Sequence, residues 1–270
     1  MLIAHTASKL HSELDRLRFC AGTRRCVSLV TTRGKLHAGH GAVINAAHTV
    51  SDLVVVAVYP EQSHRTDNLV SADEFQDMSF AEQHHADVLY CPQDRSLDDP
   101  AVKLNIELES EGHIQRDLLR AHLRILNAVQ PDIMVWGERN YEEYVAVKQM
   151  IAALDIRTQV QCIPTVRHAD GRAVSSLDEQ TSEAEQRRLS ILYETLKDAA
   201  HAIKAGAKNF SKVEKTARIA LKGAGFEAVR FRILDEEQMR PANPTTTSFR
   251  LLTSATINGH TVDDSLGLSL

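Results

Sequence analysis

The stretch RRCVSLVTTRGKLHAGHGAVINAAHTVSDLVVVAVY, residues 24–59, decides the fold. Its apolar run at 24–30 predicts a buried strand, the segment that begins at Gly39 predicts a helix, and the continuously apolar run at 52–59 predicts a second buried strand. A strand, a helix and a strand in this order form a right-handed crossover between parallel strands. The stretch therefore predicts the beginning of a doubly wound parallel α/β sheet.

The same alternation continues outward from this stretch. The further segments expected in the sheet domain are helix 74–85, strand 86–92, helix 113–130, strand 131–137, helix 140–154 and strand 158–164. The segments expected after them are helix 181–206, helix 211–225, strand 226–234 and strand 247–259. We expect a Rossmann-like domain at 1–174 and a small C-terminal α+β domain at 175–270, with the boundary near Ser175 to within several residues.

Composition excludes several classes of protein. The hydrophobic share of 43% and the charged share of 25% are ordinary for a soluble globular protein, and the net charge of −5 argues against a general nucleic-acid binder. The four cysteines lack the paired spacing of a metal site, which indicates free thiols in a reducing compartment. Residues 1–18 contain no long apolar run, and no stretch approaches the ~18 apolar residues of a membrane span. We expect a cytoplasmic protein with neither a membrane nor a nucleic acid as partner.

The sequence His37-Ala38-Gly39-His40 opens the first crossover helix. Open α/β sheets bind ligands at the carboxyl ends of their strands, where the first amides of a helix also attract anions. Two histidines three residues apart can both donate an N–H to phosphate oxygens, and Gly39 lets a nucleotide approach the backbone. This pattern favours a triphosphate site, although helix caps or surface histidines explain the four residues alone about as well.

The segment IPTVRHADGRAVSSLDEQTS, residues 163–182, is a second candidate phosphate site. It predicts a strand, a turn at Asp170-Gly171, a short return and then Ser175-Ser176 before a helix. Hydroxyls and exposed amides before a helix can clamp a phosphate, although helix capping is the commoner role of serine there.

The segment VWGERNYEEY, residues 135–144, ends another expected parallel strand. Gly137 permits close approach of a ligand to the backbone, Arg139 supplies a cation and Asn140 supplies a polar side chain. All three segments are expected along one edge of the sheet.

Together these segments resemble the pantothenate synthetase family, also called pantoate–β-alanine ligases. The family's PTMGxLHxGH stands here as TTRGKLHAGH, its NPTQF as YPEQS, its FGEKDYQQ as WGERNYEE and its PTVRxxDGLAMSSRN as PTVRHADGRAVSSLD. The resemblance spans nearly the whole chain, and this combination of motifs in this order is specific. It identifies the chain as a divergent member of the HxGH nucleotidyltransferase superfamily.

The resemblance implies an ATP-dependent acid–amine ligase with Mg²⁺ on the phosphates, a small-molecule acid and a small-molecule amine as substrates, and a homodimer. The acid would attack the α-phosphate of ATP, and the amine would then displace AMP from the acyl adenylate. Carried over by position, the implied residues are catalytic His37, His40 and Arg139, ATP-binding Thr32, Gly39, Trp136, Gly137, Asn140, Val166, Val174, Ser175 and Ser176, and substrate-binding Arg33, Tyr59, Gln62, His113 and Glu143. No dedicated metal-ligand cluster is seen.

The chain departs from the family pattern mainly where the acid and the amine would bind. The departures are Arg33 for Met, Tyr59 for Asn, Ser110 for Arg, Glu143 for Gln, Arg139 for Lys, Asn140 for Asp and Leu177 for Arg. Arg33 would favour an anionic or more polar substrate and Glu143 a cationic or hydrogen-donating one, or the two side chains pair with each other. Either Arg33 or Arg139 could replace the cation lost at Leu177.

Three hypotheses follow from these departures. The first is a ligase whose acid pocket has been rebuilt, so that its substrate need not be pantoate. The second is a nucleotidyltransferase that stops at an adenylylated product. The third is a degenerate paralogue without catalysis, which Leu177 and Ser110 favour and which the intact histidine motif argues against.

Overall fold

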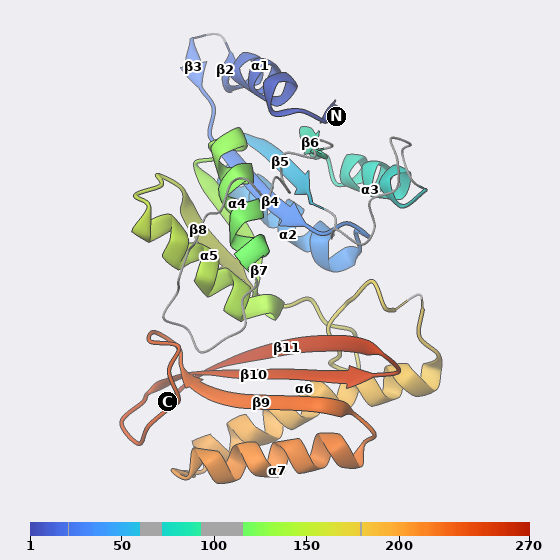
Figure 1. The fold of residues 1–270 in the computed structure, drawn as a ribbon, viewed down its shortest axis with the longest axis vertical. Coiled ribbons are helices and arrows are strands. Elements are labelled where there is room, and N and C mark those ends of the chain that lie inside the picture. The colour runs from blue at the N-terminus through green and yellow to red at the C-terminus, as the bar shows by residue number, and fades with distance from the viewer. Residues whose placement is uncertain (21, 60–71, 93–115, 179) are drawn as a thin grey trace. The chain divides into compact units, whose positions relative to one another are not determined.

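The structure is a computed structural model of the 270-residue chain, and it describes residues 1–20, 22–59, 72–92, 116–178 and 180–270. The described residues form two compact units (Figure 1). The first runs from Met1 to Pro164 without Glu138–Tyr141, and the second contains Glu138–Tyr141 and Thr165–Leu270. These units are defined by contacts, and the domain boundary expected near Ser175 stays a prediction.

The strands described in the first unit form a six-stranded, wholly parallel sheet in the order β1-β6-β5-β4-β7-β8. The bounds are β1 (Leu2–Ala4), β4 (Val27–Thr32), β5 (Leu53–Val58), β6 (Val88–Tyr90), β7 (Ile133–Gly137) and β8 (Gln159–Ile163). Every residue of β5 is buried, as expected for a parallel strand with both faces covered. The predicted doubly wound α/β class is confirmed.

Helices cover both faces of this sheet (Figure 1). Their bounds are α1 (Ala7–Arg18), α2 (Ala38–Val50), α3 (Ala72–Gln83), α4 (Arg116–Val129) and α5 (Tyr141–Ala153). Right-handed crossovers place α2 and α3 on one face and α4 and α5 on the other. Because β4 lies between β5 and β7, the chain leaves it toward one side of the sheet and later returns on its other side. The carboxyl end of β4 is therefore the switch point at which such sheets form a ligand crevice.

Sequence analysis missed the N-terminal elements and misplaced one strand boundary. Edge strand β1 is only three residues long, and α1 begins at the cap Thr6, whose side chain accepts from the Lys9 N–H. The strand expected at 24–30 begins only at Val27, because residues 23–24 instead form β3 (Thr23–Arg24), which pairs with β2 (Phe19–Cys20). Leu10 and Leu14, both buried on α1, are the helical-spacing signal that was available.

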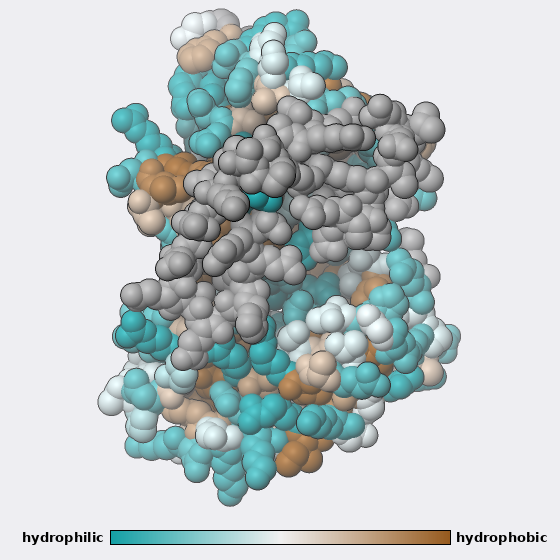
Figure 2. All heavy atoms as spheres, viewed as in Figure 1, coloured by the Kyte–Doolittle hydropathy of each residue, from teal (hydrophilic) through white to brown (hydrophobic). Residues whose placement is uncertain are grey.

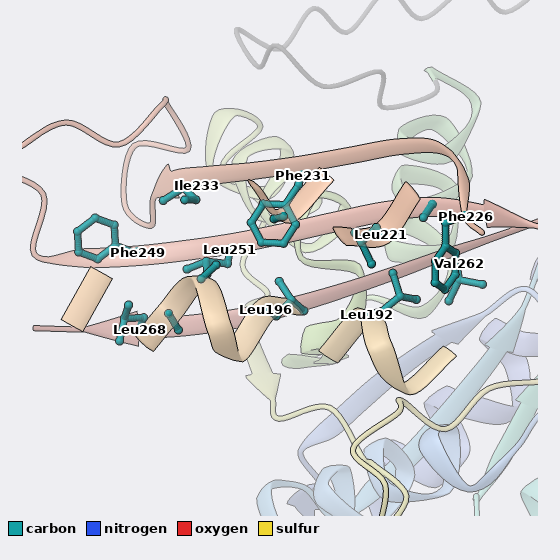
Figure 3. Packing of buried hydrophobic residues seen from close by; sticks show 14 of the residues in the cluster. Leu192, Leu196, Leu221, Phe226, Phe231, Ile233, Phe249, Leu251, Val262 and Leu268 are labelled. Carbon is teal, nitrogen blue, oxygen red and sulfur yellow. The ribbon is translucent and has the colours of Figure 1, made fainter. Parts of the chain in front are cut away.

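The second unit is a three-stranded antiparallel sheet packed on two helices. Its elements are the 3₁₀ helix η3 (Glu138–Asn140), α6 (Glu183–Lys204), α7 (Phe210–Gly223), β9 (Glu227–Asp235), β10 (Ser248–Ile257) and β11 (His260–Ser269). Figure 3 shows Leu196 of α6 near Phe231 of β9 and Leu251 of β10, and Leu192 of α6 near Leu221 of α7, all in the core of this unit. The small α+β domain is confirmed. Strand β11 was missed, although the turn before it is Asn-Gly with positive φ at both residues, a typical hairpin signal.

On the face drawn in Figure 2, the described residues form no large apolar patch. Hydrophilic residues cover most of the described surface there, and the hydrophobic ones form small separate patches. Among the helices described, none is long and apolar enough to cross a membrane.

Candidate active site

The histidine loop lies at the open end of the sheet, directly after central strand β4. His37 is the N-cap of α2, where its Nδ1 accepts from the Gly39 N–H at 3.1 Å. His40, in the first turn, accepts at Nδ1 from the His37 backbone N–H at 3.3 Å, and its Nε2 lies 3.1 Å from Oγ1 of Thr32, the last residue of β4. The two imidazoles are 4.1 Å apart between centroids. The loop therefore joins the end of the strand to the start of the helix.

These contacts determine which nitrogen donates. A backbone N–H can only donate, so Nδ1 of both neutral rings must be the acceptor and Nε2 must carry the proton. The His40 Nε2–H donates to Thr32 Oγ1, which also accepts from the Gly34 N–H at 3.1 Å. His37 Nε2–H is the donor of a half-exposed ring at a helix N-terminus, where the backbone dipoles favour an anion.

Asp77 of α3 holds the loop in place, and sequence analysis did not find it. Its carboxylate accepts from the backbone N–H of Lys35 at 2.9 Å and of Leu36 at 2.6 Å. Gly34 and Lys35 both have positive φ, at 93° and 53°, and a Cβ on Gly34 would lie 3.0 Å from an Asp77 oxygen. The loop thus combines a glycine-requiring backbone with a buried carboxylate from another element. Only the folded chain brings these residues together.

Arg33 and Glu143 form an ion pair in the first unit. This pairing is one of the two outcomes that the sequence left open. Because each charge has a partner of opposite sign, neither side chain offers an isolated charge to a substrate. The Arg33 side chain is 40% exposed, so the pair stands at a solvent-accessible position where its net stabilisation is small.

A buried histidine, His122 of α4, contacts two of the expected site residues. It is 0% exposed, and its ring lies 4.9 Å from that of Tyr59 and 5.1 Å from that of Trp136, between centroids. Its Nδ1 lies 2.8 Å from the Leu118 carbonyl and its Nε2 3.2 Å from Thr31 Oγ1. Burial lowers the pKa of His122 to about 4. Sequence analysis missed this residue because a lone histidine on a helix carries no signal.

The serine pair of the second unit lies in and beside a turn, and the helix expected at 181–206 follows at Glu183–Lys204. Helix α6 is capped by Ser182, which forms a capping box with Glu185. The Ser175 N–H donates to Asp178 at 2.9 Å, and Asp178 also accepts from His168 Nε2 at 2.9 Å. Burial alone would raise the pKa of Asp178, but these hydrogen bonds hold it below its ordinary value. The serine turn is therefore anchored by a carboxylate.

Contacts of Leu177 and of the preceding hairpin fix the remaining residues of the segment 163–182. The N–H of Leu177 donates to Ser175 Oγ at 3.2 Å, and its side chain packs against the apolar core of the second unit. The turn at Gly171, with φ of 89°, brings Val174 back beside Val166, whose carbonyl accepts the Val174 N–H at 3.0 Å. An apolar side chain at position 177 thus has a packing role here.

Arg139 is bound to carbonyl groups of the second unit. Its Nε donates to the Asp263 carbonyl at 2.9 Å and its Nη1 to the Val174 carbonyl at 3.2 Å. Burial lowers the pKa of Arg139. The adjoining Glu138 pairs with Arg250 of β10, which ties η3 to the three-stranded sheet. Arg139, expected to be catalytic, and Val174, expected to bind ATP, are thus in direct contact.

The expected site residues thus fall into two sets. The set in the first unit is Thr32, Arg33, His37, Gly39, His40, Tyr59, Trp136, Gly137 and Glu143, and the set in the second unit is Arg139, Asn140, Val166, Val174, Ser175 and Ser176. Gln62, His113 and Ser110 lie outside the described residues. Within the described part of the chain, no three His, Cys, Asp or Glu side chains are grouped as metal ligands.

The fold and the histidine loop first define a class: a doubly wound α/β protein with a histidine loop at the switch point of its sheet, the position at which such sheets bind ligands. Comparison with known proteins then gives the family. The family model described as Pantoate-beta-alanine ligase matches residues 2–265. The chain belongs to this family of ATP-dependent ligases.

Individual relatives agree with this assignment. The chain is 28% identical over 286 aligned positions to the pantothenate synthetase of Methylococcus capsulatus. This alignment covers 100% of this chain and 99% of that protein. Pantothenate synthetase from Thermus thermophilus has a similar fold, with a TM-score of 0.82 at 22% identity over 98% of this chain and 99% of that one. Pantoate-beta-alanine ligase from Francisella tularensis, solved with beta-gamma ATP and beta-alanine, has a TM-score of 0.71 at 19% identity. That match covers 98% of this chain and 97% of the Francisella chain.

Proposed function

We propose that the chain is an AMP-forming acid–amine ligase that activates a small carboxylic acid with ATP. The observation that carries this proposal is the pair of imidazoles at the carboxyl end of β4, with His37 capping α2 and His40 bonded to Thr32. Membership of the ligase family supports it, and so does the Francisella relative, which was solved with beta-gamma ATP and beta-alanine.

In the first half-reaction, a carboxylate oxygen of the acid attacks the α-phosphorus of ATP. The bond from that phosphorus to the bridging oxygen breaks, pyrophosphate leaves and an acyl adenylate forms. Negative charge grows on the leaving pyrophosphate, so N–H donors fixed before the reaction lower its barrier. We assign this role to His37, whose Nε2 carries a donor proton, together with the amides of the first turn of α2. His40, whose Nε2–H donates to Thr32, holds the loop in this position.

In the second half-reaction, an amine nitrogen attacks the acyl carbon, the bond to the AMP oxygen breaks and the amine loses a proton. No protein nucleophile is required, since positioning and electrostatics supply most of the rate. We propose that Ser175, Ser176 and Arg139 contribute further phosphate contacts. Because the described residues offer no cluster of acidic ligands, Mg²⁺ would be held mainly by the phosphates themselves.

The acid need not be pantoate. The Arg33–Glu143 ion pair and the half-buried Tyr59 and Thr31 make the α4 side of the loop polar, with the charges of the pair compensated. Such a wall favours an acid that bears neutral polar groups over a wholly apolar one. This proposal replaces the two separate expectations, an anionic substrate for Arg33 and a cationic one for Glu143.

A screen for pyrophosphate release tests the proposal. Candidate acids, pantoate among them, are incubated with the protein, ATP and Mg²⁺, with and without beta-alanine and other small amines, and products are identified by mass spectrometry. We expect acid-dependent pyrophosphate, and an amide with AMP once the right amine is present. A stable adenylylated acid with no amide would instead favour a nucleotidyltransferase, and failure to bind ATP at millimolar concentration would indicate a binding or scaffold protein.

A matched pair of variants connects the activity to the site. His37→Ala removes one proposed donor and should lower the rate of pyrophosphate release about 100-fold. His48→Ala removes an exposed histidine near the other end of α2 and should leave the rate unchanged. Equal rates for the two variants would contradict the donor role assigned to His37.

A further inference from the structure

The α4 side of the sheet contains a buried contact that the ligase chemistry described above does not use. His122 is 0% exposed, and its Nε2 lies 3.2 Å from Oγ1 of Thr31, on central strand β4. Thr31 and Thr32 are consecutive, so their side chains point to opposite faces of the sheet. Thr32 accordingly contacts His40 of α2, and Thr31 contacts His122 of α4. The Thr31 side chain therefore lies on the opposite face of the sheet from the histidine loop, at the same carboxyl end of β4.

The hydrogen bonds of His122 fix its protonation. The Leu118 carbonyl can only accept, so Nδ1, 2.8 Å away, must carry the proton. Burial keeps the ring neutral by lowering its pKa to about 4. A neutral imidazole protonated at Nδ1 has an unprotonated Nε2, which can only accept. The Thr31 hydroxyl must then be the donor in the contact between them.

This arrangement determines what Thr31 can offer to a ligand. A free threonine hydroxyl rotates and can either donate or accept. With its one proton directed at His122, Thr31 Oγ1 retains only lone pairs, and among the described residues His122 is its partner. Thr31 itself is half-buried and lies at the carboxyl end of β4, one residue before the strand ends. It can accept a hydrogen bond from a ligand hydroxyl or ammonium group and cannot donate one to a carboxylate.

The neighbours of the pair place it on the substrate side of the loop. Tyr59, directly after β5, and Trp136 of β7 contact the His122 ring from the strands on either side of β4. Arg33, two residues after Thr31, is close enough for its positive charge to lower the pKa of His122. Side chains from three adjacent strand ends, Tyr59, Thr31 and Trp136, thus meet at the His122 ring.

We propose that His122 is a positioning residue that holds Thr31 as a hydrogen-bond acceptor, and that Thr31 thereby selects an acid substrate carrying a hydroxyl or ammonium donor. This inference rests on the proposed ligase function and specifies the class of acid. A deoxy analogue would leave the Thr31 oxygen without its ligand partner. A hydroxyl-directed site discriminates against such an analogue more strongly than an apolar wall could.

The experiment compares an acid with its deoxy analogue. The substrates are pantoate and its two monodeoxy analogues, or the acid preferred in the screen and its deoxy or desamino analogue, with pyrophosphate release as the readout. We expect the wild-type kcat/KM to favour the donor-bearing acid roughly tenfold over one analogue. Thr31→Val should remove this preference, mainly by raising KM for the donor-bearing acid, while KM for ATP stays unchanged.

A double-mutant cycle tests whether His122 acts through Thr31. His122→Leu should remove the preference, and the double variant should lose no more than either single one, since both break the same contact. His122→Gln supplies an amide oxygen that can accept from Thr31, and Thr31→Ser keeps the hydroxyl, so both should retain most of the preference. Thr158→Val is the matched control: it also deletes a buried hydroxyl, bonded to the Pro131 carbonyl before β7.

The outcomes separate this inference from the proposed function. An active wild type whose preference survives Thr31→Val, or effects of the two single variants that simply add, would overturn the inference and leave the ligase function standing. Thr158→Val changing the preference as much as Thr31→Val would overturn it too, because a general structural effect would then explain both. A wild type that releases no pyrophosphate with any acid would refute the proposed function, and with it any role of Thr31 in selecting an acid.

Discussion

At the scale of single residues, the site depends on hydrogen bonds that assign each imidazole its tautomer. His37 and His40 accept at Nδ1 from backbone N–H groups, which leaves Nε2 as the donor. His122 shows the opposite assignment, because its Nδ1 faces a carbonyl oxygen. The same side chain therefore presents an Nε2–H donor on the α2 side of β4 and an Nε2 acceptor to Thr31 on the α4 side.

Stability should depend on pH through His122. Its pKa falls from the ordinary 6.5 to about 4, primarily because burial disfavours the charged ring. Between these values the unfolded chain binds a proton that the folded chain does not, so folding stability is complete above pH ~6.5 and declines as pH falls toward ~4. Between pH 7 and pH 4.5 this residue should remove about 2 kcal/mol from the free energy of unfolding.

Urea unfolding at the two pH values measures this effect. His122→Gln should lose about 2 kcal/mol less than the wild type over the same pH interval, since it has no ring to protonate. His11→Gln, which replaces an exposed histidine of α1, serves as the control and should follow the wild type. Identical pH dependence for the wild type and His122→Gln would contradict a neutral, buried His122.

At the scale of elements, α3 determines the shape of the histidine loop. Asp77 accepts from two successive loop N–H groups, and Asp77→Ala would leave both without this partner. We expect a loss of roughly 1–3 kcal/mol in stability and a higher KM for ATP, with Asp77→Asn intermediate because one acceptor oxygen remains.

Thermal unfolding and ATP-dependent kinetics together check the Asp77 effect. Gln76→Ala, an exposed neighbour on the same helix, is the control and should change neither quantity. An unchanged KM for ATP in a destabilised Asp77→Ala protein would show that the carboxylate supports the fold without shaping the nucleotide site.

Sequence reasoning predicted the elements whose signals are local and missed contacts made by folding. The apolar run at 52–59 and the histidine motif beside it predict a crossover unit, because strand burial and helix starts are encoded in neighbouring residues. Asp77 and His122 reach the site only through tertiary packing, from helices 40 or more residues away in sequence. The pairing of Arg33 with Glu143 spans 110 residues, and no periodicity could choose it over the alternatives.

The resemblance to known motifs added what local patterns could not. It assigned the serine segment and Arg139 to a nucleotide site. The contacts around these residues do not test that assignment, so it stays a proposal. The helix expected at 181–206 forms at Glu183–Lys204, two residues shorter at each end. Asp178 anchors the turn that carries the serine pair, a contact that the motif itself did not predict.

At the scale of the whole molecule, the two units have separate apolar cores. The one tryptophan of the chain, Trp136, belongs to the first unit and is 8% exposed, so its fluorescence reports on that unit. Leu196→Ala removes a fully buried side chain from the core of the second unit and should cost about 2–5 kcal/mol there. We expect it to lower the denaturant midpoint seen by far-UV circular dichroism and to leave the Trp136 midpoint in place.

Val56→Ala is the matched truncation in β5 of the first unit and should lower the Trp136 midpoint. If Leu196→Ala instead shifts both probes together, the chain unfolds as a single cooperative body and the division into two units has no thermodynamic counterpart.

The central claim is that the acid's carboxylate attacks the α-phosphate of ATP at the histidine loop. The most direct measurement supplies the acid with both carboxylate oxygens labelled with oxygen-18 and follows the label by mass spectrometry. Attack at the α-phosphate predicts one labelled oxygen in AMP and the other in the amide product. Label in inorganic phosphate or pyrophosphate, or its complete absence from AMP, would contradict the account.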